Sequence, residues 1–312
     1  MDNNKRSAVC NKSEVTIGVC VKNGAEFIGA AIDSIVEQSY PHELLEVIFV
    51  DDGSEDRTLS LIRMHASEVN MPVKIFHSTW KGLGHARNMV VTNADGDYIL
   101  WVDGDMVISK DFVRKLVEFM ENHPEVGITK GVQSLDSGGN LLATLETYAR
   151  AASRLVDYTA EKNSSKALGT GGSIYRIEAI MENGGFDENM RGYGEDFDME
   201  LRIRTAGWVL STTNVTFSDY ERRDISWANL WTRYWRRGYF THYFLHKNKG
   251  LLKHYRMLPP VAFLAGVKHA SIIFKKTHDK QSFLLPFQYA FKMISYYLGF
   301  IESHRRSFQP KS

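Results

Sequence analysis

The sequence predicts an α/β fold with a mostly parallel central sheet that helices cover on both faces. The first observation is that apolar runs of strand length alternate four times with helical patterns over residues 15–122. The second is that the first run, Val15–Val21, is a β-branched stretch typical of a strand buried on both faces. Together they favour parallel strands joined by crossover helices, and 312 residues leave room for an appendage.

Each predicted element has its own sequence signals. After the first strand, apolar residues recur at helical spacing from Phe27 to Val36, and SYPHE ends that helix. The second strand, Leu45–Val50, is a short apolar run that stops at two aspartates. Residues 126–218 are less regular. The remaining predicted elements are a helix at 58–69, a strand at 73–76, a helix from KGLGHARN through Asn93, a strand at 98–102 and helices at 113–122 and after GYGEDFD.

The C-terminal part is predicted to be a basic, aromatic and helical extension. Trp227, Trp231 and Trp235 recur every four residues and therefore share one face of a helix. From residue 220 onward the chain has 17 Lys and Arg but 4 Asp and Glu, whereas the first 219 residues have 21 and 33. An acidic body with a basic tail suggests that the two parts do different jobs.

The extension also indicates a kind of partner. Basic and aromatic residues together favour an anionic membrane surface over a merely solvated helical domain. The chain has neither zinc spacing nor an RNA-binding aromatic motif, which argues against nucleic acid. The apolar stretch at 283–301 contains Gln288 and Lys292, which favours a helix lying at the interface. The two cysteines, Cys10 and Cys20, and a start without a signal-peptide core predict a cytoplasmic protein, peripheral on the cytoplasmic face of the membrane.

Two pairs of acidic residues follow predicted strands. Asp51 and Asp52 follow the second strand, and Asp103 and Asp105 follow the fourth. The carboxyl ends of parallel strands meet at one edge of a sheet, where such folds bind ligands. The first pair suits either a turn or hydrogen bonds to a nucleotide. The second pair, with Gly104 between its members, suits either a loop or one Mg²⁺ or Mn²⁺ ion that also holds substrate phosphates.

Two further segments carry candidate residues. KGLGHARN has Arg87 where the G-x-G-x-x-G spacing needs glycine, which weakens a dinucleotide-binding interpretation. Arg87 suits either a phosphate contact or a surface position on a helix. In GYGEDFD, the acidic side chains suit either the first turn of a helix or a general base for an acceptor hydroxyl. The sequence does not choose among Glu195, Asp196 and Asp198.

In chain order, these motifs resemble those of family 2 glycosyltransferases with the GT-A fold. The resemblance covers about residues 13–220 and leaves 221–312 as the helical extension. It implies a metal-dependent, inverting transfer of a sugar from a nucleotide-diphosphate donor, with Mg²⁺ or Mn²⁺ as cofactor. The motifs that carry it are VTIGVCVKNGAEFIGAAIDSIVEQSYP, VIFVDDGSEDRT, GLGHARN, WVDGDM, GGFDE and GYGEDFDMELRIRTAGW.

The resemblance also implies roles for individual residues. It places Asp52 at the nucleotide base, Asp103 near the ribose and the metal ion, and Asp105 on the metal ion that bridges the diphosphate. It makes Asp196 the catalytic base. The other implied substrate-binding residues are Arg87 near the nucleotide, Gly172 and Ser173 beside the donor sugar and acceptor, Glu195 in the same acidic pair as the base, and Arg233, Arg236 and Arg237 over the diphosphate.

The sequence therefore predicts a glycosyltransferase of glycan or polysaccharide biosynthesis, which acts on a glycan or polyprenyl-linked acceptor at the membrane. Two alternatives stay open. A sugar-1-phosphate nucleotidyltransferase would need a glycine-rich, basic loop after the first strand, where VKNGAEFIG has a single lysine. The other alternative is a non-catalytic, membrane-bound sugar-nucleotide binder. The presence of both Asp105 and Asp196 argues against it.

Overall fold

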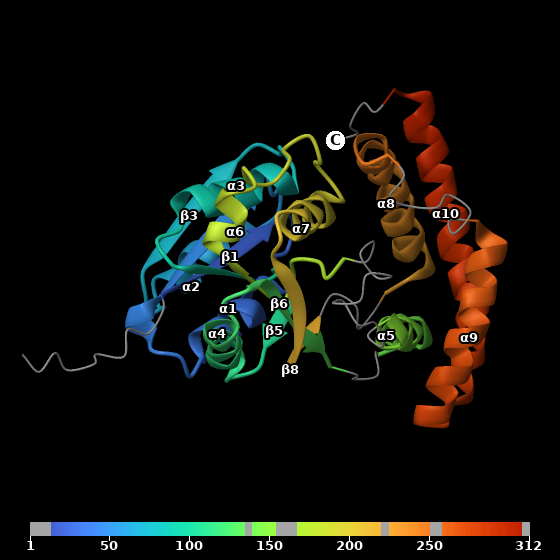
Figure 1. Cartoon of the computed structure of the whole chain (residues 1–312), viewed down its shortest axis with the longest axis horizontal. Helices are drawn as coiled ribbons and strands as arrows, with labels where there is room; N and C mark the ends of the chain where they lie inside the picture. Colours follow the sequence, from blue (N-terminus) through green and yellow to red (C-terminus); the bar gives the residue numbers. More distant parts are fainter. Residues whose placement is uncertain (1–13, 135–138, 154–166, 220–224, 250–257, 308–312) are drawn as a thin grey trace, which may run out of the picture.

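The computed structural model describes residues 14–134, 139–153, 167–219, 225–249 and 258–307, which form a helix-covered sheet with a group of helices beside it (Figure 1). The strands are β1 Val15–Val21, β2 Leu45–Asp52, β3 Val73–Ser78, β4 Tyr98–Trp101, β5 Met106–Ile108, β6 Val126–Gln133, β7 Ser173–Arg176 and β8 Val209–Asp219. The helices are α1 Ile28–Val36, α2 Thr58–Ala66, α3 Leu83–Asn93, α4 Phe112–Asn122, α5 Leu141–Ser153, α6 Ile177–Met181, α7 Glu195–Thr205, α8 Trp227–Lys247, α9 Pro259–Thr277 and α10 Leu285–Arg305, with short 3₁₀ helices η1 His42–Leu44 and η4 Lys280–Leu284.

One sheet of eight strands, in the order β3-β2-β1-β4-β7-β6-β8-β5, organises the core. Strand β1 pairs in parallel with β2 and β4, and β2 pairs in parallel with β3. Strand β7 is antiparallel to β4 and β6, whereas β8 is parallel to β6 and antiparallel to β5. The predicted α/β class is confirmed. The sequence predicts the parallel strands β1–β4. Strands β5 and β7 add antiparallel pairings that it does not predict.

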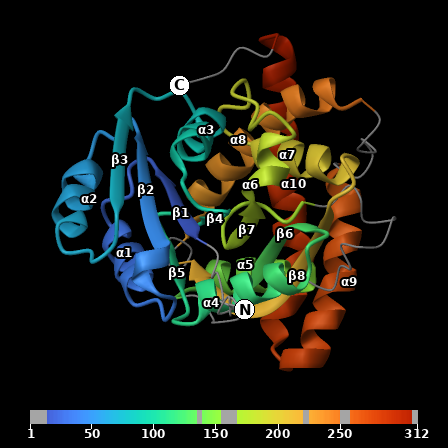
Figure 2. The same ribbon diagram turned by 60° about the vertical axis from the view of Figure 1, so that its left-hand side comes forward.

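Helices cover both faces of this sheet (Figure 2). Helices α1, α2 and α4 bury one set of apolar side chains, with Ile32 and Leu116 among them, against one face. Helices α3, α6 and α7 bury a second set, with Val90 and Ile203 among them, against the other. Fully burying an aliphatic side chain of this size stabilises the fold by about 1.5–3 kcal/mol. The two clusters fix the carboxyl ends of the parallel strands relative to α3 and α7.

Helices α8 and α10 cross at very short range beside the sheet. A Cβ atom on Gly238 would overlap the carbonyl oxygen of Tyr296, and one on Gly299 would overlap the carbonyl oxygen of Trp235. Glycine at both positions therefore allows the two backbones to approach. The predicted helical character of this part is confirmed. Within the described residues, no helix combines the length and the hydropathy that crossing a membrane requires.

Helix α5 packs on the C-terminal helices (Figure 1). Its Leu145 contacts the cluster that contains Leu285 of α10. Its Glu146 forms an ion pair with Lys292, and both side chains are buried. Lys292, one of the polar residues in the apolar stretch of the extension, therefore faces the interior of the protein. The domain boundary near residue 220 stays a prediction. Helix α5, which precedes that boundary, packs on α9 and α10, which follow it.

The contact between α8 and α10 gives one expected pH dependence. His242 is buried, with Nδ1 3.2 Å from Ser303 Oγ and Nε2 3.3 Å from His304 Nδ1. Burial, followed by His304 and His246, lowers the pKa of His242 from 6.5 to about 4. Between these values the unfolded chain binds the proton and the folded chain does not. The free energy of unfolding therefore falls as the pH drops from about 6.5 toward 4.

We expect His242→Gln to remove most of this acid sensitivity. From pH 7 to pH 5 this imidazole lowers the free energy of unfolding by about 2 kcal/mol, because the unfolded chain gains a proton that the buried side chain does not bind. Urea unfolding at the two pH values measures the loss in the protein and in the variant. His278→Asn, which replaces an exposed histidine, is the matched control and should keep the full loss. Equal losses in all three proteins would contradict the prediction.

Candidate active site

Both acidic pairs lie at the same edge of the sheet. Asp51 and Asp52 end β2, while Asp103 and Asp105 follow β4. Strand β1 lies between β2 and β4, and its Gly18 is in register with residues of both. Because the three strands are parallel, their carboxyl ends open on the same side, which is where α/β folds place ligands. The edge therefore concentrates four carboxylates within a few strands.

The first pair is held by the backbone around it. Asp51 is fully buried and accepts a 3.0 Å hydrogen bond from the N–H of Ser54, which shapes the turn after β2. Asp52 accepts hydrogen bonds from the N–H groups of Lys81 at 2.8 Å and Gly82 at 2.9 Å. It therefore fixes the loop before α3. A carboxylate has about four acceptor sites, so the remaining lone pairs of Asp52 are those that a nucleotide can use.

The second pair concentrates negative charge. Burial, followed by the charge of Asp105, raises the pKa of Asp103 from 3.8 to about 6. The positive charges of Arg87 and Lys130 oppose this shift. A Cβ atom on Gly171 would overlap Oδ2 of Asp103, so only glycine lets that backbone approach the carboxylate. Asp103 thus lies between its acidic partner and the loop that precedes β7.

The residues at this edge fit a divalent cation of the Mg²⁺ or Mn²⁺ type. Asp103 and Asp105 offer only oxygen ligands, which hard cations prefer. Within the described residues, no group of three or more His, Cys, Asp or Glu side chains is arranged as a complete metal site. Mg²⁺ is commonly held by one or two carboxylates, with substrate phosphates and water completing its shell. A bound cation would also relieve the repulsion between the two carboxylates.

Arg87 is buried rather than exposed, so its interpretation as a surface arginine is wrong. It is 6% exposed and forms an ion pair with Glu195 at the start of α7. Its Nη2 donates a 2.6 Å hydrogen bond to Thr170 Oγ1. Its guanidinium lies 5.9 Å from the ring centroid of Trp101 and 5.7 Å from that of Phe186. Arg87 therefore joins α3 to α7 and to the loop before β7.

Asp196 lies beside the same loop. Helix α7 begins directly after Gly194, which has φ +100°, a conformation that favours glycine. Asp196 Oδ1 accepts a 2.7 Å hydrogen bond from the N–H of Phe197. Its Oδ2 lies 3.5 Å from the position a Cβ atom on Gly169 would take. After burial and Asp105, the charge of Asp196 also contributes to the raised pKa of Asp103, which agrees with a short separation between the two carboxylates.

The neighbouring carboxylates of α7 are neutralised by cations. Glu195 is 2% exposed and is paired with the arginine of α3. Asp198 is buried and pairs with Arg202 at 2.8 Å and Lys247 at 2.9 Å. Within the described part of the chain, Asp196 has no ion pair of this kind. The structure therefore distinguishes Glu195, Asp196 and Asp198 by their ion pairs, whereas the sequence does not distinguish them.

Two ionisable residues clamp the loop before β7, and sequence reasoning missed both. Glu200 accepts 2.7 Å hydrogen bonds from the N–H groups of Leu168 and Gly169. Lys130 Nζ donates to the carbonyl oxygens of the same two residues, at 2.6 and 3.1 Å. Burial, followed by the charge of Asp196, raises the pKa of Glu200 to about 8. The clamp sets the position of the backbone that contacts the site carboxylates.

Gly172 and Ser173 shape this loop from within. Gly172 has φ +73°, and a Cβ atom there would meet the ring of Phe217. Its N–H donates a 2.9 Å hydrogen bond to the carbonyl oxygen of Trp101, the last residue of β4. Ser173 is buried, and its hydroxyl donates a 2.7 Å hydrogen bond to the carbonyl oxygen of Gly169. The groups that would contact a ligand here are therefore backbone atoms of the loop.

The three arginines of α8 do not share one environment. Arg237 lies 4.4 Å from the ring centroid of Tyr193 and 5.6 Å from that of Tyr234. Although burial opposes it, these tyrosines keep the pKa of Arg237 above its usual value. Arg233 lies one turn earlier on the same helix face and is half-buried, whereas Arg236 is exposed. Arg237 therefore packs on Tyr193, close to the start of α7, whereas Arg236 faces solvent.

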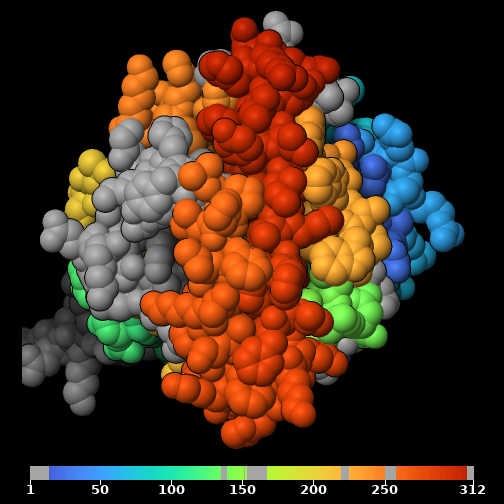
Figure 3. Space-filling view, turned by 90° about the vertical axis from the view of Figure 1, so that its right-hand side faces the viewer, coloured from blue at the N-terminus to red at the C-terminus, as the bar shows by residue number. Residues whose placement is uncertain are grey.

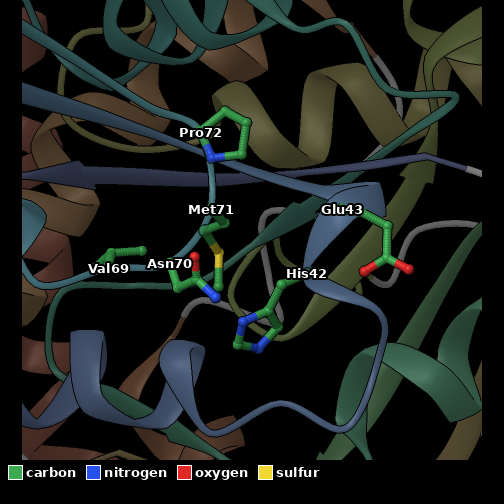
Figure 4. Close-up of a pocket in the computed structure, with 6 residues that line it drawn as sticks. All are labelled: His42, Glu43, Val69, Asn70, Met71 and Pro72. Atoms are coloured by element: carbon green, nitrogen blue, oxygen red, sulfur yellow. The ribbon is translucent and has the colours of Figure 1, made fainter.

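An open surface pocket of about 490 Å³ lies at the other end of the sheet (Figure 4). It is lined by η1 residues that precede β2 and by Val69–Pro72, which precede β3. Because β2 and β3 are parallel, this pocket is at their amino ends, far from the acidic pairs at the carboxyl ends. None of the candidate residues lines it, so it is not the predicted site.

Comparisons with known proteins identify the family and the fold. Residues 16–180 match the family model described as glycosyl transferase family 2. The chain is 30% identical over 101 residues to poly(ribitol-phosphate) beta-N-acetylglucosaminyltransferase TarS of Staphylococcus aureus, covering 32% of this chain and 18% of that protein. It is 32% identical over 151 residues to an uncharacterized glycosyltransferase of Haemophilus influenzae, covering 47% and 56%. The matched segments thus span less than two-thirds of these relatives.

Solved structures show the same fold. The mannosyltransferase PcManGT from Pyrobaculum calidifontis, in complex with GDP-Man and Mn²⁺, superposes with a TM-score of 0.66 at 19% identity, covering 93% of this chain and 87% of that one. Staphylococcus aureus TarS 1–349 superposes with a TM-score of 0.53 at 17% identity, covering 94% and 92%. At these identities the likeness concerns the fold, and it extends over the C-terminal helices as well as the sheet.

Proposed function

Because the chain belongs to glycosyl transferase family 2, we propose that it moves a sugar from a nucleotide-diphosphate donor to an acceptor hydroxyl, with inversion at the sugar carbon. One observation carries this proposal. The Asp103 carboxylate and the Asp196 carboxylate lie along the same loop before β7, because a Cβ atom on Gly171 would overlap the first and one on Gly169 would lie 3.5 Å from the second. A site that pairs phosphate chemistry with an acceptor base needs this juxtaposition.

The donor half of the site is assigned to the sheet edge. Asp52, fixed by the loop before α3, accepts a hydrogen bond from the nucleotide base, and Asp103 from the ribose. Asp103 and Asp105 would hold Mg²⁺ or Mn²⁺, which when bound neutralises charge on the departing diphosphate. Arg237, whose pKa is kept high by Tyr193, Tyr234 and, after them, Asp196, contributes positive potential from α8. Mn²⁺ in the structural relative PcManGT supports the choice of ion.

The acceptor half is assigned to Asp196. Its Oδ1 is occupied by the N–H of Phe197, which leaves Oδ2 to accept the proton of the acceptor hydroxyl. Attack of that hydroxyl oxygen on the sugar carbon breaks the bond to the diphosphate in a single displacement, which inverts the carbon. Glu195 is paired with Arg87 and Asp198 with Arg202, so neither is as well placed to take a proton.

The donor and acceptor classes are proposed from the relatives. UDP-GlcNAc is bound by TarS and GDP-Man by PcManGT, which supports a nucleotide-diphosphate sugar as donor. The name of TarS specifies a poly(ribitol-phosphate) acceptor. By analogy, we assign a glycan or polyprenyl-linked saccharide as the acceptor of this protein. A sugar-1-phosphate nucleotidyltransferase is the competing enzyme class.

A thermal-shift screen tests the donor half. UDP, GDP, UTP and GTP are each added with and without Mn²⁺, and a ligand in large excess over its Kd raises the melting temperature by mass action. We expect one nucleoside diphosphate to stabilise the protein only when Mn²⁺ is present. Mass spectrometry of the matching nucleotide sugar with candidate acceptors then reports transfer. Stabilisation by triphosphates alone, with pyrophosphate as product, would favour a nucleotidyltransferase. Binding without transfer would favour a non-catalytic binder.

A further inference from the structure

The outer face of α9, η4 and α10 is unusually apolar. Figure 3 shows α9 and α10 as the outermost layer of this side of the molecule. Nine of the thirteen large hydrophobic side chains that are exposed among the described residues lie between Leu258 and Leu298, so they are concentrated here. Six of them define what we call the apolar strip: Leu264, Val267, Phe283, Phe287, Ile294 and Leu298.

The members of the apolar strip share one side of the helices that carry them. Phe287, Ile294 and Leu298 are spaced by seven and four residues, which puts them on one face of α10. Phe287 also meets Phe263 of α9, with ring centroids 5.4 Å apart, so the two helices join into one surface. Phe287 is 64% and Leu264 68% exposed, which is rare for such residues in a contiguous patch unless something covers them.

Positive charge borders the apolar strip. On α9, Lys268 and Lys275 follow Leu264 by four and eleven residues and therefore lie on its face. The two acidic residues of 258–307 are both engaged, because Asp279 accepts a hydrogen bond from Tyr148 and Glu302 pairs with Arg306. The exposed cations of this border, which we call the basic rim, are Lys268, Lys275, Lys276, Lys280 and Arg305.

The inner faces of the same helices are already packed. Gly299 of α10 lies against the backbone of Trp235 in α8, and Ile273 of α9 lies in the cluster with Leu145 of α5. The outward side therefore carries the apolar residues that the fold does not use. A helix with one face packed on protein and the other apolar with flanking lysines has the pattern of an element that lies in a membrane interface.

From these observations we infer that the apolar strip and the basic rim bind an anionic lipid bilayer, with α9 and α10 lying in the plane of its surface. The apolar side chains enter the boundary between headgroups and acyl chains, and the lysines contact the negative headgroups. Charge complementarity favours this occupant over a second copy of the chain. A symmetric dimer through this face would bring two basic rims together and repel. The inference does not depend on the transfer reaction.

Vesicle co-sedimentation of the full chain, without nucleotide or metal, tests the inference. We expect the protein to pellet with vesicles of phosphatidylcholine and phosphatidylglycerol and to stay in solution with phosphatidylcholine alone, and high salt should release it. The double variant Leu264→Glu, Phe287→Glu should abolish pelleting. Replacing Lys268 and Lys275 by Gln should weaken the apparent affinity about fivefold for each lysine. Met181→Glu, on an exposed apolar residue of α6, is the matched control and should bind normally.

Two results would overturn the inference. The first is equal behaviour of the protein with anionic and neutral vesicles, whether it binds both or neither. The second is a dimer in analytical ultracentrifugation that the Leu264→Glu, Phe287→Glu variant dissociates while vesicle binding stays unchanged. Thermal melting of each variant checks folding, and these side chains are exposed, so the melting temperature should hardly move. Since no donor is present, failure here and failure of the nucleotide screen are distinguishable.

Discussion

Asp196→Asn should nearly abolish sugar transfer while leaving donor binding intact. Asparagine keeps the shape of the side chain, and its Oδ1 can still accept the hydrogen bond from the N–H of Phe197. It cannot take a proton from the acceptor hydroxyl. General base catalysis contributes a factor of about 10² to 10⁴, so kcat should fall by that amount. The donor contacts assigned to Asp52 and Asp103 are untouched, so the donor Kd should stay the same.

The experiment measures the rate of sugar transfer and the affinity for the donor separately. Steady-state kinetics gives kcat, and calorimetric titration with the nucleoside diphosphate in Mn²⁺ gives the Kd of the donor site. Glu178→Gln is the matched control, because Glu178 is an exposed acid in the first turn of α6 and lies outside the site. We expect the control to match the unmodified protein in both quantities. A kcat near normal in Asp196→Asn would remove Asp196 from the role of base.

The parallel half of the sheet could be predicted because its strands are buried on both faces. Strand β1 has the predicted bounds, since its apolar run lies between the polar residues Glu14 and Lys22. Strand β2 extends two residues beyond the predicted Leu45–Val50, because Asp51 and Asp52 still pair with β3. A run of apolar residues does not show that the charged residues after it continue the hydrogen-bonded pairing of the strand. Helix α2 stops at Ala66, three residues before the predicted end.

The antiparallel half was not predictable from periodicity. Strand β7, Ser173–Arg176, has four residues, too few to establish an alternation of period two. Strand β8, Val209–Asp219, contains serines and threonines throughout and so lacks a continuous apolar run. Their place in the sheet depends on pairing with β4 and β6, which are distant in the sequence. Such pairings are set by tertiary packing rather than by local propensity.

The candidate site also has features that the sequence could predict and features that only the tertiary structure reveals. The end-of-strand position of Asp103 and Asp105 is a local feature, so the sequence could indicate it. The ion pair of Arg87 with Glu195 joins residues 108 apart in the chain, and only the meeting of α3 with α7 creates it. Glu200 lies one turn after the predicted base, and in the sequence it is one more acid of a charged helix. Its burial, which gives it a role in the loop, depends on the fold.

Asp105→Asn should remove the metal dependence of donor binding. The substitution keeps the size of the side chain but takes away one of the two negative charges that we assign to the divalent ion. The nucleoside diphosphate then loses the bridge between its phosphates and the protein, although Asp52 still holds the nucleotide base. We expect Mn²⁺ to stop improving donor affinity, so that the Kd in Mn²⁺ rises by about tenfold or more, which corresponds to about 1.4 kcal/mol.

Titration of the nucleoside diphosphate in Mn²⁺ and in chelator, on the protein and the variant, measures this effect. The quantity of interest is the ratio of the two Kd values, because a general loss of stability would raise both and leave the ratio unchanged. Asp95→Asn is the matched control: Asp95 pairs with Lys74 near the start of β4, at the opposite end of the strand from Asp105. A variant that keeps the full Mn²⁺ effect would show that the ion does not need the negative charge of Asp105. The charge of the departing diphosphate would then be left to the other groups of the site, with the arginines of α8 among them.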